Sequence, residues 1–221
     1  MDDTTALPAE ARDADARDRA IETASARGAY WTGSRLFVAL SAMIFGSGAF
    51  AYFYLHSVDN NTLWHPSGQR PSDFVSISVL TFVVVGAGLF WWYSRSMLAG
   101  TANPSDWRVA AGVAAAFFLA AGLVQFWGMT RTGFYPGSSG YASVYVAVMP
   151  LFAVYCLGAA YWVETVFARS LRAKHVLSPD EATRDSDDVV SFTGTVVGAK
   201  LFVVFVAIVG ATFFVLFSVL K

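Results

Sequence analysis

Ionisable side chains are scarce within the long apolar segments of this sequence. Of its 221 residues, 56% are hydrophobic and only 14% are charged, whereas soluble domains carry about 25% charged residues. No histidine and no aspartate falls in the middle of an apolar segment. A membrane protein that moves protons, electrons or charged solutes by itself needs such groups at membrane depth. The sequence therefore indicates a partner subunit that packs, holds lipid and supports chemistry done elsewhere.

Cysteine and histidine are also rare, and their positions argue against a metal site. Cys156 is the one cysteine, so the chain forms neither a disulfide framework nor a cysteine metal cage. His56 and His65 fall on one side of the predicted membrane and His175 on the other, and none is placed to bind a haem iron within it. A metal site built from His56, Asp59 and His65 is an alternative that their spacing supports only weakly. We predict no catalytic, cofactor-binding or metal-binding residue in this chain.

Phosphate-binding and nucleic-acid-binding patterns are missing as well. The glycine pairs at 46–48 and 86–88 lie inside apolar segments, with no strand before them and no lysine after them. They therefore do not match a phosphate-binding loop. The chain also has no basic patch interleaved with aromatic residues, which is the pattern of a nucleic-acid surface. We predict no nucleic-acid partner.

Five apolar segments are each long enough to cross a membrane, which requires about 20 apolar residues in a helix. The predicted spans are residues 35–57, 73–93, 107–127, 141–167 and 192–220. We predict an all-α integral membrane bundle of five transmembrane helices over residues 35–221. Residues 1–34 are polar and acidic with few large aliphatic side chains, so we predict a disordered cytoplasmic tail, with a loose alanine-rich helix as the alternative.

The distribution of Lys and Arg predicts the orientation of the chain. An odd number of spans places the two termini on opposite sides of the membrane. Eleven basic residues fall on the N-terminal side: Arg12, Arg17, Arg19, Arg27, Arg35, Arg95, Arg108, Arg169, Arg172, Lys174 and Arg184. Three fall on the other side: Arg70, Arg131 and Lys221. Because loops rich in Lys and Arg stay in the cytoplasm, we predict a cytoplasmic N-terminus and an external C-terminus.

Small residues recur at four-residue spacing in two of the spans. Gly112, Ala116 and Ala120 share one face of the third span, and Gly194 and Gly198 share one face of the fifth. Small residues at this spacing let helix backbones approach closely in lipid. We interpret both sets as packing faces within the bundle, with a docking face for another subunit as the alternative.

A few polar residues lie inside the predicted spans. Gln125 and hydroxyls such as Ser41 are interpreted as interhelical hydrogen-bonding groups rather than as the lining of a pore. Glu164 lies about one turn from the inner end of its span, and Lys200 about two turns from the inner end of the last span. The simplest interpretation is that both snorkel to the interface. The alternatives are an ion pair between Glu164 and Lys200, or a contact of Lys200 with a lipid headgroup.

Three stretches of the sequence carry a resemblance to a known family. They are residues 43–45 followed by 48–54, then Trp64-His65-Pro66, and then 136–145, a serine-rich turn that leads into the fourth span. In their order and spacing they resemble subunit III of the haem-copper oxidases of the cytochrome c type, in its short five-helix bacterial form. The resemblance covers residues 30–220, and the helix number and orientation agree with it.

The sequence departs from the pattern of that family at several positions. The glutamate of the family's first conserved helix falls on Ala42, and two histidines of the family fall on Phe152 and Tyr155. The last helix lacks the family's His and Asp and has Lys200 instead. Any role of the lost carboxylate in proton delivery therefore does not carry over.

The resemblance implies an ancillary subunit of a terminal oxidase in aerobic respiration, located in a bacterial plasma membrane. Such a subunit holds no redox centre; it binds phospholipid and stabilises the catalytic subunit. Haem and copper are then expected in the partner subunits, oxidase subunits I and II. The alternatives are a subunit III-like partner of a nitric oxide reductase and a small independent transporter. The lack of carboxylates within the spans and of broken helix pairs disfavours the transporter.

Overall fold

The computed structural model describes residues 9–58, 64, 71–179, 183–184 and 186–220. These residues form five long helices and two short helical segments, and no strand occurs among them. The elements are α1 (Ala9–Val58), α2 (Asp73–Leu98), α3 (Pro104–Met129), α4 (Gly140–Arg172), η1 (Lys174–Leu177), α5 (Asp187–Phe214) and η2 (Val215–Val219).

All five long helices contain a stretch that is long and apolar enough to cross a membrane. These stretches are Gly28–Val58, Asp73–Leu98, Pro104–Met129, Gly140–Arg172 and Asp187–Val219. They confirm the predicted all-helical fold and its five spans, and they indicate a multi-pass membrane protein. Each observed stretch extends a few residues beyond the predicted span at one end or both, because helices continue into the headgroup region, where apolar composition no longer marks them.

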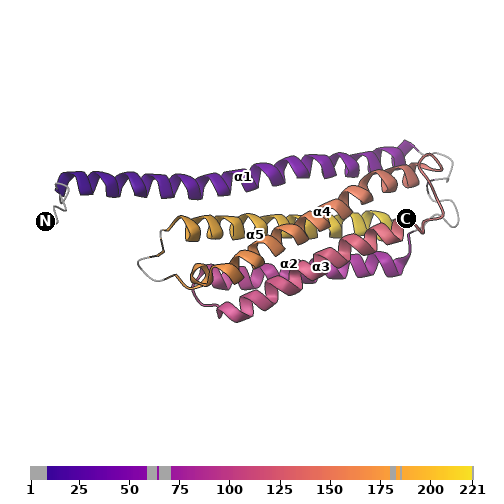
Figure 1. Ribbon diagram of the computed structural model, residues 1–221. Coiled ribbons are helices and arrows are strands. Elements are labelled where there is room, and N and C mark those ends of the chain that lie inside the picture. Colours follow the sequence, from indigo (N-terminus) through magenta and orange to yellow (C-terminus); the bar gives the residue numbers. More distant parts are fainter. Residues whose placement is uncertain (1–8, 59–63, 65–70, 180–182, 185, 221) are drawn as a thin grey trace.

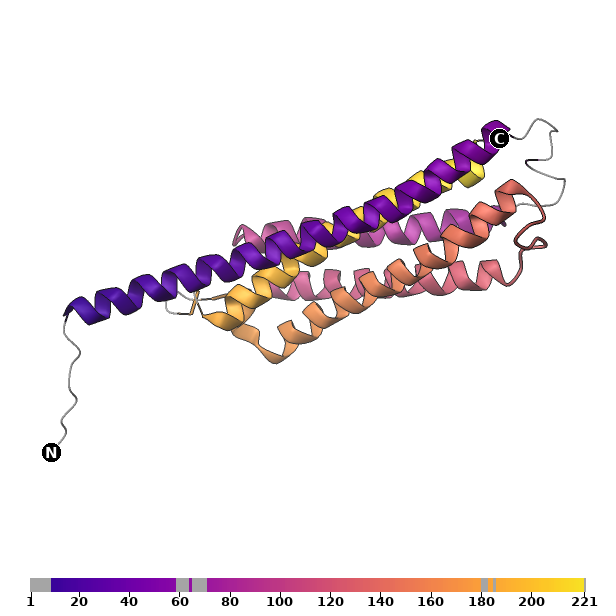
Figure 2. The same ribbon diagram turned by 90° about the horizontal axis from the view of Figure 1, so that it is seen from above.

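The helices α2 to α5 form a bundle, and α1 lies along one side of it (Figure 1). Within the bundle α3 packs against α2 and α4. The helix α5 also packs against α2 and α4, and α1 packs against α5 from outside the bundle. Seen from above, α1 runs over α5 and continues well beyond the bundle at its N-terminal end (Figure 2). The core is therefore centred on α4 and α5, and α1 is the most peripheral span.

Residues 9–34, for which the sequence predicts a disordered tail, are helical and continuous with the first span. Two features of the sequence account for this difference. The segment is rich in Ala, Arg and Glu, which have high helix propensity, and no proline interrupts residues 9–58. The first span also supplies a stable helical turn from which the helix propagates, so the costly nucleation step is avoided.

Local sequence determines where the helices begin. At α3, Pro104 occupies the first turn and the Ser105 backbone N–H donates to Asn103 Oδ1 at 3.2 Å, a standard N-terminal cap. At α4, the Ala142 backbone N–H donates to Ser139 Oγ at 3.1 Å. These caps satisfy backbone donors that would otherwise have no partner inside the helix.

The glycine face of α5 packs against α1. A methyl group added at Gly198 would lie 2.5 Å from Ser34 Oγ, and one added at Gly194 would lie 2.6 Å from the Tyr30 ring. The Tyr30 hydroxyl also lies 3.0 Å from Ser191 Oγ. Close approach without bulky side chains is the usual basis of helix association in lipid, so this face attaches α1 to the bundle.

The small-residue face of α3 lies at the edge of its contact with α4. A methyl group added at Gly112 would lie 3.7 Å from Phe167, an ordinary contact distance, while Ala116 is exposed and Ala120 is half-buried. The closest approach of the two helices is at Gly122 instead, where an added methyl group would lie 2.7 Å from a Leu157 methyl carbon. Gly112 therefore lies beside α4, but a tighter contact between the two helices occurs at Gly122.

Candidate functional site

Several polar pairs connect helices in the bundle, and two of them involve residues that the sequence singles out. Gln125 Nε2 donates to the Tyr145 hydroxyl at 3.4 Å, joining α3 to α4. The Tyr155 hydroxyl donates to Ser41 Oγ at 2.9 Å, joining α4 to α1. Both pairs consist of neutral groups, and each satisfies donors and acceptors that would be costly to leave unpaired in an apolar setting. Gln125 and Ser41 are thus interhelical hydrogen-bonding groups, whose partners the sequence alone did not identify.

Phe152 and Tyr155, two of the positions at which the resemblance expects ionisable residues, are packing positions in this fold, whereas Ala42 is not. Phe152 is buried, and a methyl group added at Gly210 would lie 2.9 Å from its ring. Tyr155 makes an edge contact with Phe45 at 4.9 Å between ring centroids. Ala42 is exposed on the outer side of α1. Hydrogen bonding and aromatic packing therefore replace charge at this part of the bundle.

An aromatic cluster joins the ends of α1, α4 and α5 near the C-terminus. Trp64 is buried there, with edge contacts to Tyr52 and to His56 at 5.1 Å between centroids. The Tyr141 hydroxyl donates to the Phe217 carbonyl at 3.0 Å, which holds η2 against α4. The cluster places His56 against aromatic rings. Asp59 and His65, the other members of the alternative metal site, lie outside the described residues.

His175 lies at the opposite end of the molecule from His56, on η1, where it is exposed. Among the described residues, no group of three His, Cys, Asp or Glu side chains is arranged to hold a metal ion. Cys156 is fully buried within α4.

The two charged side chains inside the last spans lie on different sides of the bundle. Glu164 is exposed and lines a shallow groove of about 250 Å³ between α3 and α4. Lys200 is half-buried on α5 and lies within electrostatic range of Arg95 on α2. No ion pair joins Glu164 and Lys200 in the described part of the chain. Their matched depth did not bring them together because the two helices turn these positions toward different neighbours.

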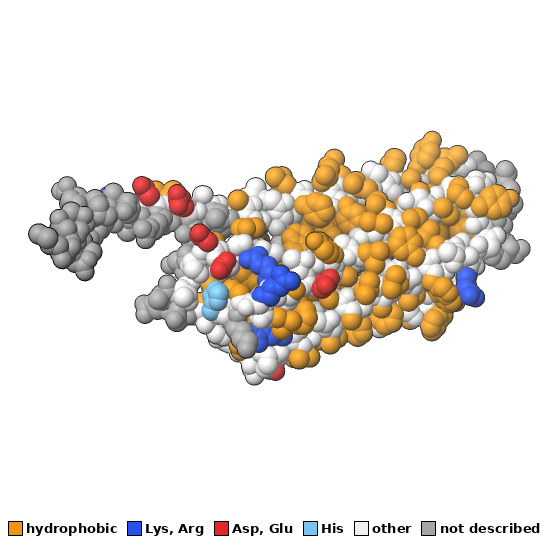
Figure 3. Space-filling view, viewed as in Figure 1, with side chains coloured by type: hydrophobic (Ala, Val, Ile, Leu, Met, Phe, Trp, Pro, Cys, Tyr) orange, Lys and Arg blue, Asp and Glu red, His pale blue; other side chains and the backbone are white. Residues whose placement is uncertain are grey.

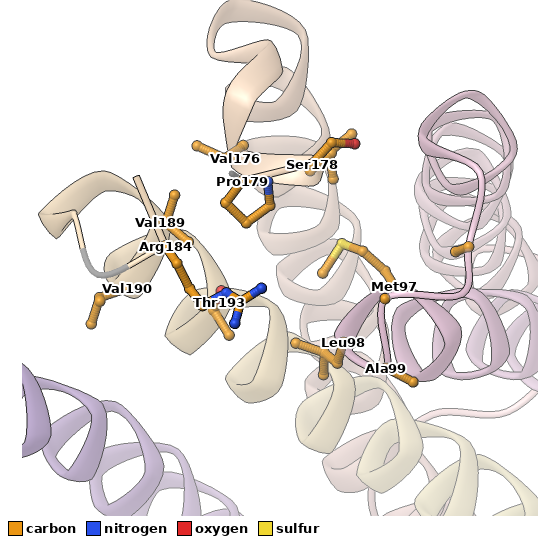
Figure 4. A pocket seen from close by; sticks show the side chains of 13 residues that line it. Met97, Leu98, Ala99, Val176, Ser178, Pro179, Arg184, Val189, Val190 and Thr193 are labelled. Carbon is orange, nitrogen blue, oxygen red and sulfur yellow. The ribbon is translucent and has the colours of Figure 1, made fainter. Parts of the chain in front are cut away.

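A pocket of about 560 Å³ opens at the end of the bundle where α2, η1 and α5 meet. Met97 and Leu98 of α2 form one wall, and Val176 and Pro179 lie across from them (Figure 4). Figure 4 shows the Arg184 side chain extending between these walls. The pocket combines apolar walls with one basic group, so it is suited to a polar or anionic group at the membrane surface rather than to a redox centre.

The outward face of α1 is an extended apolar surface. In its 18-residue apolar window only 17% of the residues are buried, compared with 50% in the windows of α4 and α5. Its exposed apolar side chains include Leu36, Leu40, Met43, Phe50 and Phe53. Hydrophobic side chains cover this region, whereas charged side chains gather near one end of the molecule (Figure 3). We call the α1 side chains named here the α1 outer face.

No family model matches the sequence, and no curated protein matches it. The resemblance of the three stretches to oxidase subunit III therefore stays a prediction, and the functional conclusion depends on the geometry of the membrane-embedded surfaces.

Proposed function

We propose that this chain is an ancillary, cofactor-free subunit of a haem-copper terminal oxidase in a bacterial plasma membrane. In this role it stabilises the catalytic subunit, in which haem and copper reduce oxygen, and it binds phospholipid. The observation that carries the proposal is the α1 outer face, which leaves a complete transmembrane helix largely uncovered by its own bundle. The sequence resemblance supplies the identity of the partner.

A peripheral helix of this kind fits a subunit interface. α1 is attached to the bundle mainly through α5 and α4, and it presents large apolar and aromatic side chains outward. Transmembrane helices associate through close van der Waals packing. A catalytic subunit packed against this face would bury Met43 and Phe50, and it would restrain α1 against the rest of the bundle.

The interior of the bundle supports an ancillary role rather than independent transport. The polar pairs Gln125–Tyr145 and Ser41–Tyr155 consist of amide and hydroxyl groups. Such groups fasten helices, but they do not carry charge at neutral pH. Proton and ion pathways are built from ionisable side chains that face the bundle interior. Chemistry that needs a charged intermediate would therefore take place in the partner.

The proposed orientation has the N-terminus in the cytoplasm. The basic side chains that the structure describes gather at the end where α2 finishes and α5 begins: Arg35, Arg95, Arg108, Arg169, Arg172 and Arg184. Arg131 lies at the opposite end, in the turn between α3 and α4. This distribution follows the tendency of basic loops to remain in the cytoplasm.

Purification of the affinity-tagged chain from its native membrane in a mild detergent tests the proposal. We expect an oxidase subunit I to co-purify, and the complex to show haem absorbance bands in reduced-minus-oxidised spectra. Replacing Met43 with Trp on the α1 outer face should reduce co-purification, because a packed protein interface does not accommodate the larger ring. Leu119→Trp is the matched control, since Leu119 is an exposed apolar residue of α3.

Two results would contradict the proposal. Recovery of the chain without a haem-containing partner would refute the oxidase role. Co-purification of a nitric oxide reductase core instead of an oxidase subunit I would favour the alternative partner. Equal co-purification of the Met43→Trp and Leu119→Trp variants would show that α1 faces lipid instead of the catalytic subunit.

A further inference from the structure

A third hollow lies between α2 and α5. Its volume is about 540 Å³, and its lining is apolar: Val84, Ala87, Gly88, Trp91, Val204, Ala207, Ile208 and Ala211. From Val84 to Trp91 the groove follows α2 for about 10 Å, at the 1.5 Å rise of an α-helix. Several lining residues are Ala or Gly, and their short side chains leave the groove open along its length. We call it the α2–α5 groove.

Two basic residues lie at one end of the α2–α5 groove. Arg95 is one helical turn beyond Trp91 on α2, and Lys200 is one turn before Val204 on α5. Because α2 and α5 are antiparallel, both steps lead to the same end of the groove. The positive charge of Arg95 lies within electrostatic range of Lys200, in agreement with this register of the two helices.

The depth of Arg95 matches the headgroup region of a bilayer. Arg95 is in the last turn of α2, and its guanidinium carbon is 5.6 Å from the centroid of the Trp91 ring. Trp92, beside it, is exposed. Tryptophans at a helix end mark the boundary between the hydrocarbon and the headgroups. The apolar groove therefore lies at acyl-chain depth and Arg95 at phosphate depth, and the Lys200 ammonium would reach the same level by extending along α5 from about two turns inside the predicted span.

The basic pair has no acidic partner within the described residues. Two like charges held near each other at the edge of a low-dielectric region repel, and Lys200 is also half-buried. An anion placed between them would offset both costs. A phosphate is well suited, because guanidinium and ammonium groups form strong charge-assisted hydrogen bonds with its oxygens. An apolar helix of a partner protein would cover the groove but leave both cations uncompensated.

We propose that the α2–α5 groove binds an anionic phospholipid, with one acyl chain along the groove and the phosphate between Arg95 and Lys200. The inference rests on the lipid-binding part of the proposed function and names the site and the charge class of the lipid. It requires no oxidase partner. In the proposed orientation the lipid belongs to the cytoplasmic leaflet.

Native mass spectrometry of the purified full-length chain, with equal amounts of phosphatidylglycerol and phosphatidylcholine, tests the site. We expect preferential retention of phosphatidylglycerol. The double variant Arg95→Gln/Lys200→Gln should lower that retention roughly tenfold or more, because two charge-assisted contacts are lost. Arg131→Gln is the matched control, since Arg131 also lies over a tryptophan, 4.8 Å from the Trp127 ring centroid, but at the other end of the bundle.

A second variant tests the acyl chain separately. Gly88 lines the groove, and a methyl group added there meets no atom within 4 Å, so Gly88→Leu should fill the groove without disturbing the bundle. It should lower the retention of both lipids. Gly46→Leu on α1 is its control, because a methyl group added at Gly46 also meets no atom within 4 Å.

The outcomes separate this site from the oxidase proposal. Loss of lipid selectivity in the Arg95→Gln/Lys200→Gln variant, with Arg131→Gln unchanged, supports the basic pair as the phosphate site. Unchanged retention in the charge variant, or in Gly88→Leu, would overturn the proposal. Because the assay uses the isolated chain, its failure leaves the co-purification result intact, and loss of the partner leaves the lipid result intact.

Discussion

Attachment of α1 to the bundle depends on the absence of a side chain at Gly198, and the variant Gly198→Ala measures this dependence. The added methyl group would lie 2.5 Å from Ser34 Oγ and 3.0 Å from the Trp162 ring. Ser34 Oγ donates to the Tyr30 carbonyl at 2.8 Å, so it cannot turn away without losing that hydrogen bond. The two helices must therefore separate or repack.

The magnitude follows from comparison with a glycine that has space around it. A methyl group added at Gly158 on α4 would lie 4.0 Å from the Phe202 ring, which is free of strain. Both substitutions gain the same helix propensity, about 1 kcal/mol, and this gain cancels in the comparison. What remains is the steric cost at Gly198, about 1–3 kcal/mol for overpacking. Gly198→Ala should therefore unfold about 2–12 °C below Gly158→Ala, at about 2–4 °C per kcal/mol for a chain of this size.

Thermal unfolding in detergent, followed by circular dichroism, gives this difference directly. The double variant Ser34→Ala/Gly198→Ala removes Ser34 Oγ, the atom nearest to the added methyl group. It should recover part of the lost thermal stability, while the contact with Trp162 remains. A double-mutant cycle isolates the coupling between the two positions. If Gly198→Ala is as stable as Gly158→Ala, or if the cycle shows no coupling, then α1 does not pack on this face of α5 and the reasoning is wrong.

Three further results are expected. Gln125→Leu alone should cost less stability than Tyr145→Phe alone, because Tyr145→Phe leaves the buried Gln125 amide without its partner, at a cost of about 1–3 kcal/mol. The double variant should be less destabilised than the sum of the two single variants, as measured by thermal unfolding. Additive effects would show that Gln125 and Tyr145 are not coupled. Cys156 should resist thiol reagents until the protein unfolds, because it is fully buried; rapid labelling of the native protein would contradict its placement. Cysteines introduced at Ser25 and Ser67 in a Cys156→Ala background should be labelled by an impermeant reagent on intact cells only at position 67, and the reverse pattern would refute the proposed orientation.

The spans could be predicted from the sequence because hydrocarbon depth imposes a simple requirement of length and apolarity. The N-terminal limit of α1 could not be predicted in this way, because hydropathy marks the part of a helix that lies in the membrane and not the full length of the helix. Residues 9–34 are helical through their own propensity and through continuity with the span. At α3 the cap signal Asn103-Pro104 marks the true start of the helix, three residues before the predicted span begins at Trp107.

The rotation of each helix about its axis was the main quantity that sequence patterns did not determine. Glu164 and Lys200 were matched in depth, but Glu164 faces a groove beside α3, and Lys200 faces Arg95 on α2. Hydrogen-bonding type was easier to predict than partner: Gln125 was expected to bond another helix, yet nothing in its own span identifies Tyr145. Such pairings depend on which helices are neighbours, and in lipid that choice comes from close packing of small residues rather than from an apolar stripe.

The N-terminal part of α1 extends well beyond the membrane-spanning part of the helix. The helix has 50 residues, or about 75 Å at 1.5 Å per residue, against a hydrocarbon core of about 30 Å. Its first 19 residues, before the span begins at Gly28, would project about 28 Å from the bundle, as the extension in Figure 1 shows. A tilt of about 10° in the membrane would displace that tip by about 5 Å at this length. A partner bound to the N-terminal end of α1 would thus move by several ångströms when α1 moves only slightly where it contacts α5.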